Sequence, residues 1–320
     1  MKIHIVSGFL GAGKTTFIKK WIPLLDGKVC LIENEFGDVS IDSNLFPHTL
    51  EVKEIYSGCI CCNLVGDFIE GIKELYEIHH PDHLIIEPSG VGALSEVLKV
   101  CRRSIALYPE AMALGNVCTL VDVTAFSDYV DNFGGFYTDQ IMSAPQVFLS
   151  YLKDVEHTAL SRILREIQEI TPKGQIIYEE WITMEDAEFD AHMNLYGDGR
   201  YELPKDRMLP LAEQLLSSFS IRRPKVFSLE NFVQLFNGLD NLSAGQLIRS
   251  KGVIKLMTGE HVHFDYTPFH REWRYIEDTV EPGIAFIGSA IDERILRKSF
   301  SKSVVIKNAK GGLSNEVSGL

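Results

Sequence analysis

A glycine-rich octapeptide near the start limits what this chain can fold into. Its sequence is Gly8-Phe9-Leu10-Gly11-Ala12-Gly13-Lys14-Thr15. The apolar run 2–7 before it predicts a buried strand, and residues 16–22 after it have helical spacing. Because glycine has no Cβ, such a loop lets several backbone N–H groups turn inward together. A strand, a glycine loop and a helix in this order predict a site that holds the phosphates of a nucleotide.

The same pattern gives a role to each residue of the loop. Lys14 is expected to reach the terminal phosphates, and Thr15 to hold Mg²⁺. The other residues expected to bind the nucleotide are Gly8, Gly11, Ala12, Gly13 and Thr16. The alternative is a glycine-rich turn without a ligand, which the flanking strand and helix disfavour.

The composition narrows the class of protein. The chain has 320 residues, 45% of them hydrophobic, which is ordinary for a folded protein with two domains. A formal charge of −13 argues against nucleic acid as a partner, because binding phosphate backbones needs a concentrated basic surface. The first apolar run is too short for a signal peptide, and no stretch is long enough to cross a bilayer. We therefore expect a cytoplasmic protein with no membrane partner.

A second apolar strand, 29–32, leads into an acidic, glycine-containing segment at 33–42. Ligands of open α/β sheets bind at the carboxyl ends of the strands, where this segment is expected to lie. The segment is a candidate switch loop that the γ-phosphate and Mg²⁺ would order. A plain solvated loop is the alternative.

Three of the six cysteines form a cluster, which consists of Cys59, Cys61 and Cys62. The cluster lies between a predicted strand, 50–55, and a predicted helix, 63–78, whose N-terminus favours thiolate over thiol. Three thiolates supply most of a tetrahedral Zn²⁺ site. Either Glu35 completes the site, or the fourth position stays open for transfer of the metal to another protein. Structural or redox thiols are the alternative, because this spacing is not that of a zinc finger.

A third apolar strand ends in an acid, Glu87, and is followed by a turn that contains Gly90. A carboxylate at the end of a strand beside a phosphate loop can hold Mg²⁺ directly or through water. Gly90 would let its backbone N–H approach the γ-phosphate. The alternative is a turn with a solvated glutamate.

The remaining pattern predicts the architecture. Further strands at 116–122, 146–149 and 175–178 alternate with helical segments, which predicts an α/β fold with a doubly wound, mainly parallel sheet over residues 1–180. Residues 181–222 are expected to form an acidic linker with a helix at 209–219, and residues 309–320 a flexible tail. Residues 223–308 are expected to form a smaller α+β domain with antiparallel strands, in which His261 and His263 give weak evidence for a metal site.

Four strings, GFLGAGKTT, ENEFG, GCICC and EPSG, resemble in order and spacing the CobW family of P-loop GTPases. Phe286-Ile287-Gly288 and Asp292-Glu293 resemble the C-terminal domain of that family. The resemblance implies a metallochaperone or metallocofactor-assembly protein that uses GTP. It places the phosphates on residues 8–16, Mg²⁺ or the attacking water at Glu87, and the transition metal at the three clustered cysteines.

The chain departs from the family at the segment that recognises the base. Where the family ordinarily has Asn-Lys-x-Asp, this chain has Ser150-Tyr151-Leu152-Lys153, with Asp154 one place late. A lysine cannot accept the two hydrogen bonds that the family's aspartate takes from guanine. GTP is therefore expected from the resemblance, with ATP possible.

Together these observations predict a slow Mg²⁺-dependent nucleoside triphosphatase, because no arginine finger is visible. Nucleotide state would control the delivery of Zn²⁺, with Co²⁺ or Ni²⁺ as possible alternatives, to a client metalloprotein or cofactor-dependent enzyme. Three alternatives remain open: a nucleotide-gated chaperone or reactivator of a corrinoid enzyme without metal cargo, a small-molecule kinase, and a binding module without turnover. A homodimer is possible.

Overall fold

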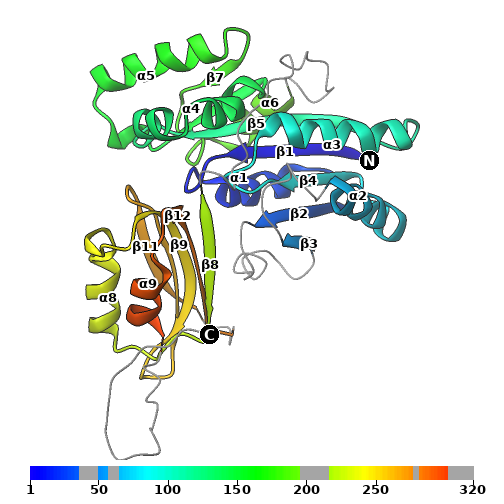
Figure 1. Ribbon diagram of the computed structural model, residues 1–320. Helices are drawn as coiled ribbons and strands as arrows, with labels where there is room; N and C mark the ends of the chain where they lie inside the picture. The colour runs from blue at the N-terminus through cyan, green and yellow to red at the C-terminus, as the bar shows by residue number, and fades with distance from the viewer. Residues whose placement is uncertain (36–49, 57–64, 195–215, 277–280, 302–320) are drawn as a thin grey trace, which may run out of the picture. The chain divides into compact units, whose positions relative to one another are not determined.

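The computed structural model describes residues 1–35, 50–56, 65–194, 216–276 and 281–301 (Figure 1). They divide into two compact units, a first unit that ends at residue 194 and a second unit that begins at residue 216. Each unit has its own sheet and its own hydrophobic core.

The first unit is built on a parallel sheet with the strand order β3-β2-β4-β1-β5-β6-β7. Its strands are β1 Lys2–Gly8, β2 Val29–Glu35, β3 Glu51–Tyr56, β4 His83–Glu87, β5 Ala113–Asp122, β6 Gln146–Ser150 and β7 Gln175–Ile177. Strand β1 lies at the centre, between β4 and β5. Since all the pairings are parallel, the carboxyl ends of these strands lie at one edge of the sheet.

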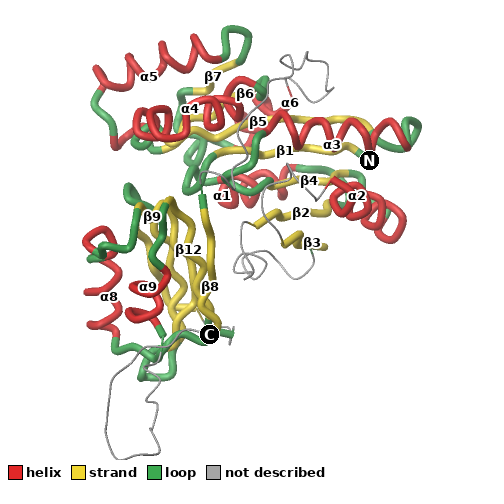
Figure 2. Tube along the Cα trace, viewed as in Figure 1, coloured by secondary structure: helices red, strands yellow, loops and turns green. Residues whose placement is uncertain are grey.

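Helices cover both faces of this sheet, as expected for parallel strands that are joined through helical crossovers (Figure 2). Their bounds are α1 Lys14–Trp21, α2 Val65–His79, α3 Leu94–Leu107, α4 Phe126–Met142, α5 His157–Ile170 and α6 Asp186–Asn194. Apolar side chains of α2 and α3 pack with Ile3 and Ile5 of β1, whereas those of α1 and α6 pack with Val6 on the opposite face. The predicted doubly wound fold is confirmed.

Residues 181–194 fold into the first unit, although the sequence analysis assigned them to a linker. Trp181 is buried, and Phe189 of α6 packs on Phe17 of α1 with their ring centroids 5.0 Å apart. The predicted helix at 209–219 mostly lies outside the described residues, but its last residues begin strand β8 instead.

The second unit is an antiparallel sheet in the order β11-β10-β9-β12-β8. Its elements are β8 Ser217–Arg222, α8 Leu229–Asn237, β9 Gln246–Lys255, β10 His261–Tyr266, β11 Arg271–Ile276, β12 Gly283–Ser289 and α9 Glu293–Phe300. Apolar residues of α8 and α9 pack on one face of the sheet (Figure 1). An isolated bridge joins Phe227, which precedes α8 in the chain, to Leu256.

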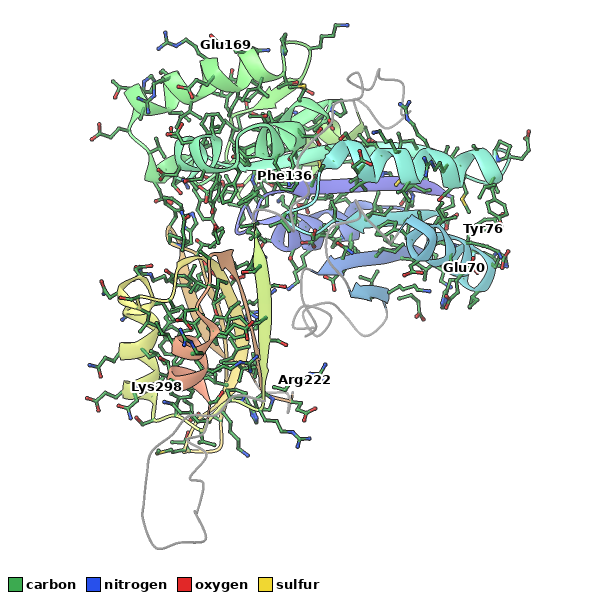
Figure 3. All side chains as sticks on the ribbon, viewed as in Figure 1. Glu70, Tyr76, Phe136, Glu169, Arg222 and Lys298 are labelled. Carbon is green, nitrogen blue, oxygen red and sulfur yellow. The ribbon has the colours of Figure 1, made fainter. Side chains whose placement is uncertain are left out.

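Apolar side chains fill the interior of each unit, and charged side chains lie on the surface, as expected for folded units (Figure 3). Phe136 of α4 is buried in the first unit, whereas Glu70 of α2 and Glu169 of α5 are exposed.

His261 and His263 lie on the same face of β10, and His263 is buried. None of the described helices combines the length and the apolar composition that a bilayer span requires.

A buried histidine occupies the centre of the first unit's sheet. His4 of β1 accepts a hydrogen bond at Nδ1 from the Asn116 N–H, at 3.0 Å. Its other nitrogen, Nε2, therefore carries the proton and donates to Nδ1 of His83, 2.9 Å away. Burial, and then the neighbouring His83 and Lys2, lower the pKa of His4 to about 3. The neutral ring is thus the form that fits the fold.

This pKa predicts an acid-sensitive contribution to stability. The unfolded chain protonates His4 near its ordinary pKa of 6.5, whereas the folded chain does not until about 3, so stability falls as the pH drops through this window. Between pH 7 and pH 5 the loss from His4 is expected to be about 2 kcal/mol. Urea unfolding at both pH values should show a loss of at least this size in the wild type, because His263 also has a pKa lowered to about 3, and a smaller loss in His4→Gln. The exposed His157→Gln should keep the wild-type loss, and an equal loss in all three proteins would contradict the assignment.

Candidate functional site

The candidate site begins where β1 ends and the glycine loop turns into α1. Gly8, Gly11 and Gly13 have φ values of +146°, +81° and +98°, in the region that side chains disfavour. A Cβ on Gly8 would also lie 2.7 Å from the carbonyl oxygen of Leu120, so the close approach of β5 requires glycine here. Gly13 is the N-cap of α1, and the N–H groups of the first turn are therefore open to an anion.

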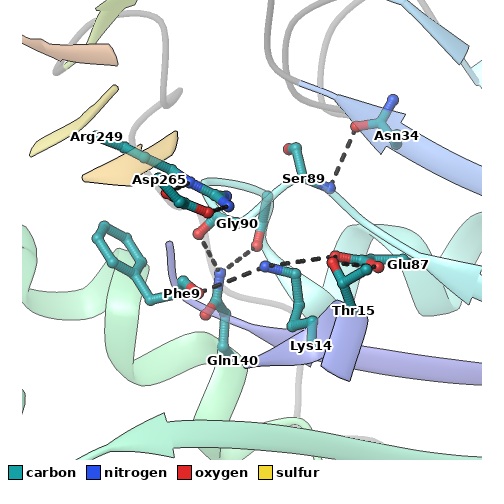
Figure 4. A network of polar contacts seen from close by, with 11 residues as sticks. Phe9, Lys14, Thr15, Asn34, Glu87, Ser89, Gly90, Gln140, Arg249 and Asp265 are labelled. Carbon is teal, nitrogen blue, oxygen red and sulfur yellow. Dashed lines mark hydrogen bonds and ion pairs between the residues drawn. The ribbon is translucent and has the colours of Figure 1, made fainter. Parts of the chain in front are cut away.

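Lys14, Thr15 and Glu87 meet at the start of α1 (Figure 4). The Thr15 hydroxyl lies 3.3 Å from Oε1 of Glu87, and the Lys14 Nζ lies 4.0 Å from the same oxygen. The Lys14 ammonium also donates to the carbonyl oxygen of Phe9, at 3.4 Å, and its residue is only 5% exposed. The structure therefore brings together the three side chains that the sequence analysis assigned to phosphate and Mg²⁺.

The Thr15 hydroxyl and the Glu87 carboxylate fit a magnesium ion. Mg²⁺ prefers oxygen ligands in an octahedron with bonds of about 2.1 Å, which places neighbouring ligand atoms about 3.0 Å apart. The observed 3.3 Å between the two side-chain oxygens is close to this spacing. Glu87 is the last residue of β4, and Thr15 lies in the first turn of α1, just after the glycine loop that follows the neighbouring strand β1.

The turn after β4 is held against the glycine loop. A Cβ on Gly90 would lie 2.8 Å from the backbone nitrogen of Leu10, so only glycine permits this contact between the two turns. Gln140 of α4, which is 1% exposed, donates from Nε2 to the carbonyl oxygens of Gly90 and Gly92, at 3.2 and 2.8 Å. Gln140 thus fixes the position of the turn through these two carbonyl oxygens, a role that the sequence analysis missed.

Strand β2 adds polar groups beside Glu87. The Ser89 N–H donates to Oδ1 of Asn34, at 3.3 Å (Figure 4). Glu33 is buried and stands in register with Glu87 on the neighbouring strand. Glu33 and Asn34 were expected to begin the acidic loop but belong to β2. Glu35 is the last residue of this strand, in backbone register with Tyr56.

A second set of contacts supports the glycine loop from β6 and β7. Ser150 donates from its hydroxyl to the carbonyl oxygen of Ala12, at 2.8 Å, and accepts a hydrogen bond of 3.2 Å from Nε1 of Trp181. The Tyr151 hydroxyl donates to the carbonyl oxygen of Gly11, at 3.3 Å. Trp181 follows β7, and a Cβ on Gly13 would lie 3.4 Å from its ring. The sequence analysis missed the role of Trp181.

The three clustered cysteines, Cys59, Cys61 and Cys62, lie outside the described residues. The other three cysteines, Cys30, Cys101 and Cys118, are buried. Burial raises the pKa of the Cys101 thiol to about 12 and also raises that of Cys118, so these two are expected to stay protonated and inert.

One further group of metal-ligating side chains occurs in the described residues. Ligand atoms of Glu179, Glu188 and His192 lie within 4.8 Å of one another. Both glutamates are exposed, and His192 faces Glu179 at 3.5 Å from Nε2, which an ordinary surface ion pair explains. The group therefore serves below as a control.

Two family descriptions match this chain. "CobW/HypB/UreG, nucleotide-binding domain" matches residues 2–178, and "Cobalamin synthesis protein cobW C-terminal domain" matches residues 216–304. The matches coincide closely with the described parts of the first and second units.

Several curated relatives are similar to parts of the chain. The zinc chaperone CobW of Sinorhizobium sp is 42% identical over 97 residues, which are 28% of this chain and 27% of the relative. The zinc chaperone YeiR of Escherichia coli (strain K12) is 37% identical over 146 residues, 45% of this chain and 44% of the relative. The matched parts thus span less than half of either relative.

Among solved structures, the Zn(II)-bound YjiA GTPase from E. coli is 19% identical, with a TM-score of 0.45 over 93% of this chain and 97% of that one.

The match to the nucleotide-binding domain shows the family of this chain, because it covers more than half of the chain and includes every residue of the glycine loop and Glu87. The protein belongs to the CobW/HypB/UreG family of P-loop nucleoside triphosphatases and carries the CobW C-terminal domain.

Proposed function

We propose that the protein is a Mg²⁺-dependent GTPase whose nucleotide state controls the binding and delivery of Zn²⁺ to a client metalloprotein. Nucleotide binding and hydrolysis are supported by one observation, the contacts among Lys14, Thr15 and Glu87 at the glycine loop. Binding and delivery of Zn²⁺ are supported by relatives named as zinc chaperones and by the three clustered cysteines.

Each residue at the glycine loop would have a separate role in phosphoryl transfer. The Lys14 ammonium would pair with the β- and γ-phosphates, and the N–H groups in the first turn of α1 would bind the same charges. The Thr15 hydroxyl and the Glu87 carboxylate would hold Mg²⁺. When bound, the ion neutralises negative charge that develops on the phosphate oxygens. Gln140 holds the Gly90 turn in place, and the Gly90 N–H would bind the γ-phosphate.

The topology supports a link between the nucleotide and the cysteines. Strands β3, β2 and β4 are parallel neighbours, so β3 ends at the edge of the sheet where Glu87 ends β4. Glu35 is paired with Tyr56, the last residue of β3, and Cys59 follows three residues later in the sequence. We propose that Cys59, Cys61 and Cys62 bind the metal and that Glu35 is the fourth ligand.

The test is the Zn²⁺ affinity of the reduced full-length protein, measured by competition with a chromophoric chelator. We expect the affinity in Mg²⁺ with a non-hydrolysable GTP analogue to differ at least about tenfold from that with GDP, which is about 1.4 kcal/mol of coupling. Replacing the three cysteines by serine should remove the tight site. Co²⁺ and Ni²⁺ are measured alongside Zn²⁺, because sites of this kind select metals by geometry as well as ligand type.

The matched control is His192→Gln with Glu188→Gln, which removes the other group of possible ligands. This variant should keep both the tight site and its dependence on nucleotide. Loss of the tight site in this control would contradict the cysteine assignment. A Zn²⁺ affinity that is the same with the GTP analogue and with GDP would contradict nucleotide-controlled delivery of Zn²⁺. It would favour the alternative function, a nucleotide-gated chaperone of a cofactor enzyme without metal cargo.

A further inference from the structure

The two sides of the glycine loop carry different chemistry. On the β4 side of β1, Glu87 meets Lys14 and Thr15, which marks the end of the site that takes the terminal phosphate and Mg²⁺. On the β5 and β6 side, the loop carbonyls of Gly11 and Ala12 contact residues 150 and 151. A nucleotide whose phosphates end at Glu87 therefore extends its nucleoside toward the end of β6.

Tyr151 is held at this point in an unusual conformation. Its φ of +63° and ψ of +33° are left-handed, which is uncommon for a residue with a bulky side chain. The hydrogen bond from its hydroxyl to Gly11 ties the ring to the glycine loop. A strained residue that contacts a ligand loop is a candidate for a functional role. Its half-buried aromatic ring has the chemistry of a stacking surface.

The side chains at positions 150, 152 and 153 offer no acceptor for the hydrogen-bond donors of guanine, and the Asp154 carboxylate stands one place after the position that supplies the acceptor in the family. The Ser150 hydroxyl is buried and is already bonded to Ala12 and Trp181. Lys153 is exposed and has only donors. Guanine presents an N–H₂ donor at N2, but both purines present an acceptor at N7, which a lysine can bind equally well.

We propose that Tyr151 is the surface on which the nucleotide base stacks and that Lys153 contacts the base edge, so that this chain binds adenine and guanine nucleotides with similar affinity. The proposal rests on the nucleotide binding of the proposed function and specifies its substrate class. Stacking tolerates any base because every base has a π-face. The turnover reaction is then that of a purine nucleoside triphosphatase rather than that of a strict GTPase.

The test is the affinity of the full-length protein for GDP and ADP, each with Mg²⁺, from competition with fluorescent analogues of both. We expect the two dissociation constants of the wild type to agree within about threefold, well inside the tenfold that about 1.4 kcal/mol would give. Tyr151→Ala should weaken both nucleotides by about tenfold, and Tyr151→Phe should restore most of this loss because the ring remains. Lys153→Asp should favour GDP over ADP by about tenfold or more, since it supplies the missing acceptor.

Asp154→Asn is the matched control, because Asp154 is exposed and stands one place after Lys153. Its GDP to ADP ratio should equal that of the wild type. A wild-type preference for GDP above about a hundredfold would overturn the proposal. So would a guanine preference that Asp154→Asn removes, because Asp154 would then be the acceptor. Neither outcome affects the proposed coupling to Zn²⁺, which is measured separately.

Discussion

Lys14→Ala is expected to lower the turnover number for GTP hydrolysis about a thousandfold, because it removes the only cation that the described residues place at the glycine loop beside Glu87. In the proposed function the ammonium would stabilise the charge that develops on the phosphates during transfer, and the buried position of Lys14 would strengthen this interaction. Phosphate release under saturating GTP and Mg²⁺ measures the effect.

Lys28→Ala is the matched control for this prediction. Lys28 is exposed and directly precedes β2, at the amino edge of the sheet, away from the glycine loop. Its variant should hydrolyse GTP at the wild-type rate. Thermal unfolding of both variants shows whether the fold is intact. If folded Lys14→Ala kept more than about a tenth of wild-type turnover, the phosphate-binding role of the lysine would be wrong.

The central parts of the fold and site were predictable because their signals are local. The glycine loop follows its strand and precedes its helix within one short stretch, and Glu87 ends an apolar strand. The geometry of a parallel sheet then brings the carboxyl ends of β1 and β4 together without any further information. For this reason the sequence alone predicts that Lys14, Thr15 and Glu87 lie close together, as they do.

The supporting residues were not predictable, because their contacts join distant parts of the chain. Ser150 bonds a carbonyl 138 residues earlier, and Gln140 bonds a carbonyl 50 residues earlier. Trp181 was assigned to an acidic linker because charged residues surround it in the sequence. A usable signal lay in Phe189 and Met193, which are four residues apart and therefore share one face of a helix.

Strand β8 was missed for a related reason. It lies at the edge of its sheet, and four of its six residues are serine or arginine, so alternation of apolar and polar residues is weak. Pairing with β12, which is far away in the sequence, supplies its backbone hydrogen bonds. A strand defined by its partner cannot be recognised from its own composition.

Glu87→Gln is expected to lower GTP turnover about a hundredfold and to weaken the dependence on Mg²⁺, while leaving the fold intact. The carboxamide has nearly the same shape, and its oxygen can still accept the hydrogen bond from Thr15. It lacks the negative charge that a divalent cation requires, so the loss isolates the electrostatic role of the carboxylate. Mg²⁺ titrations of phosphate release measure both effects.

The exposed Glu110→Gln is the control, because it removes the same charge far from the carboxyl ends of β1 and β4. Raising the Mg²⁺ concentration should recover part of the lost turnover in Glu87→Gln but not in Lys14→Ala, since only the former weakens ion binding. Recovery in neither variant would place Glu87 at the attacking water instead, the other role that its position allows. The response to Mg²⁺ therefore separates the two functions of the carboxylate in one experiment.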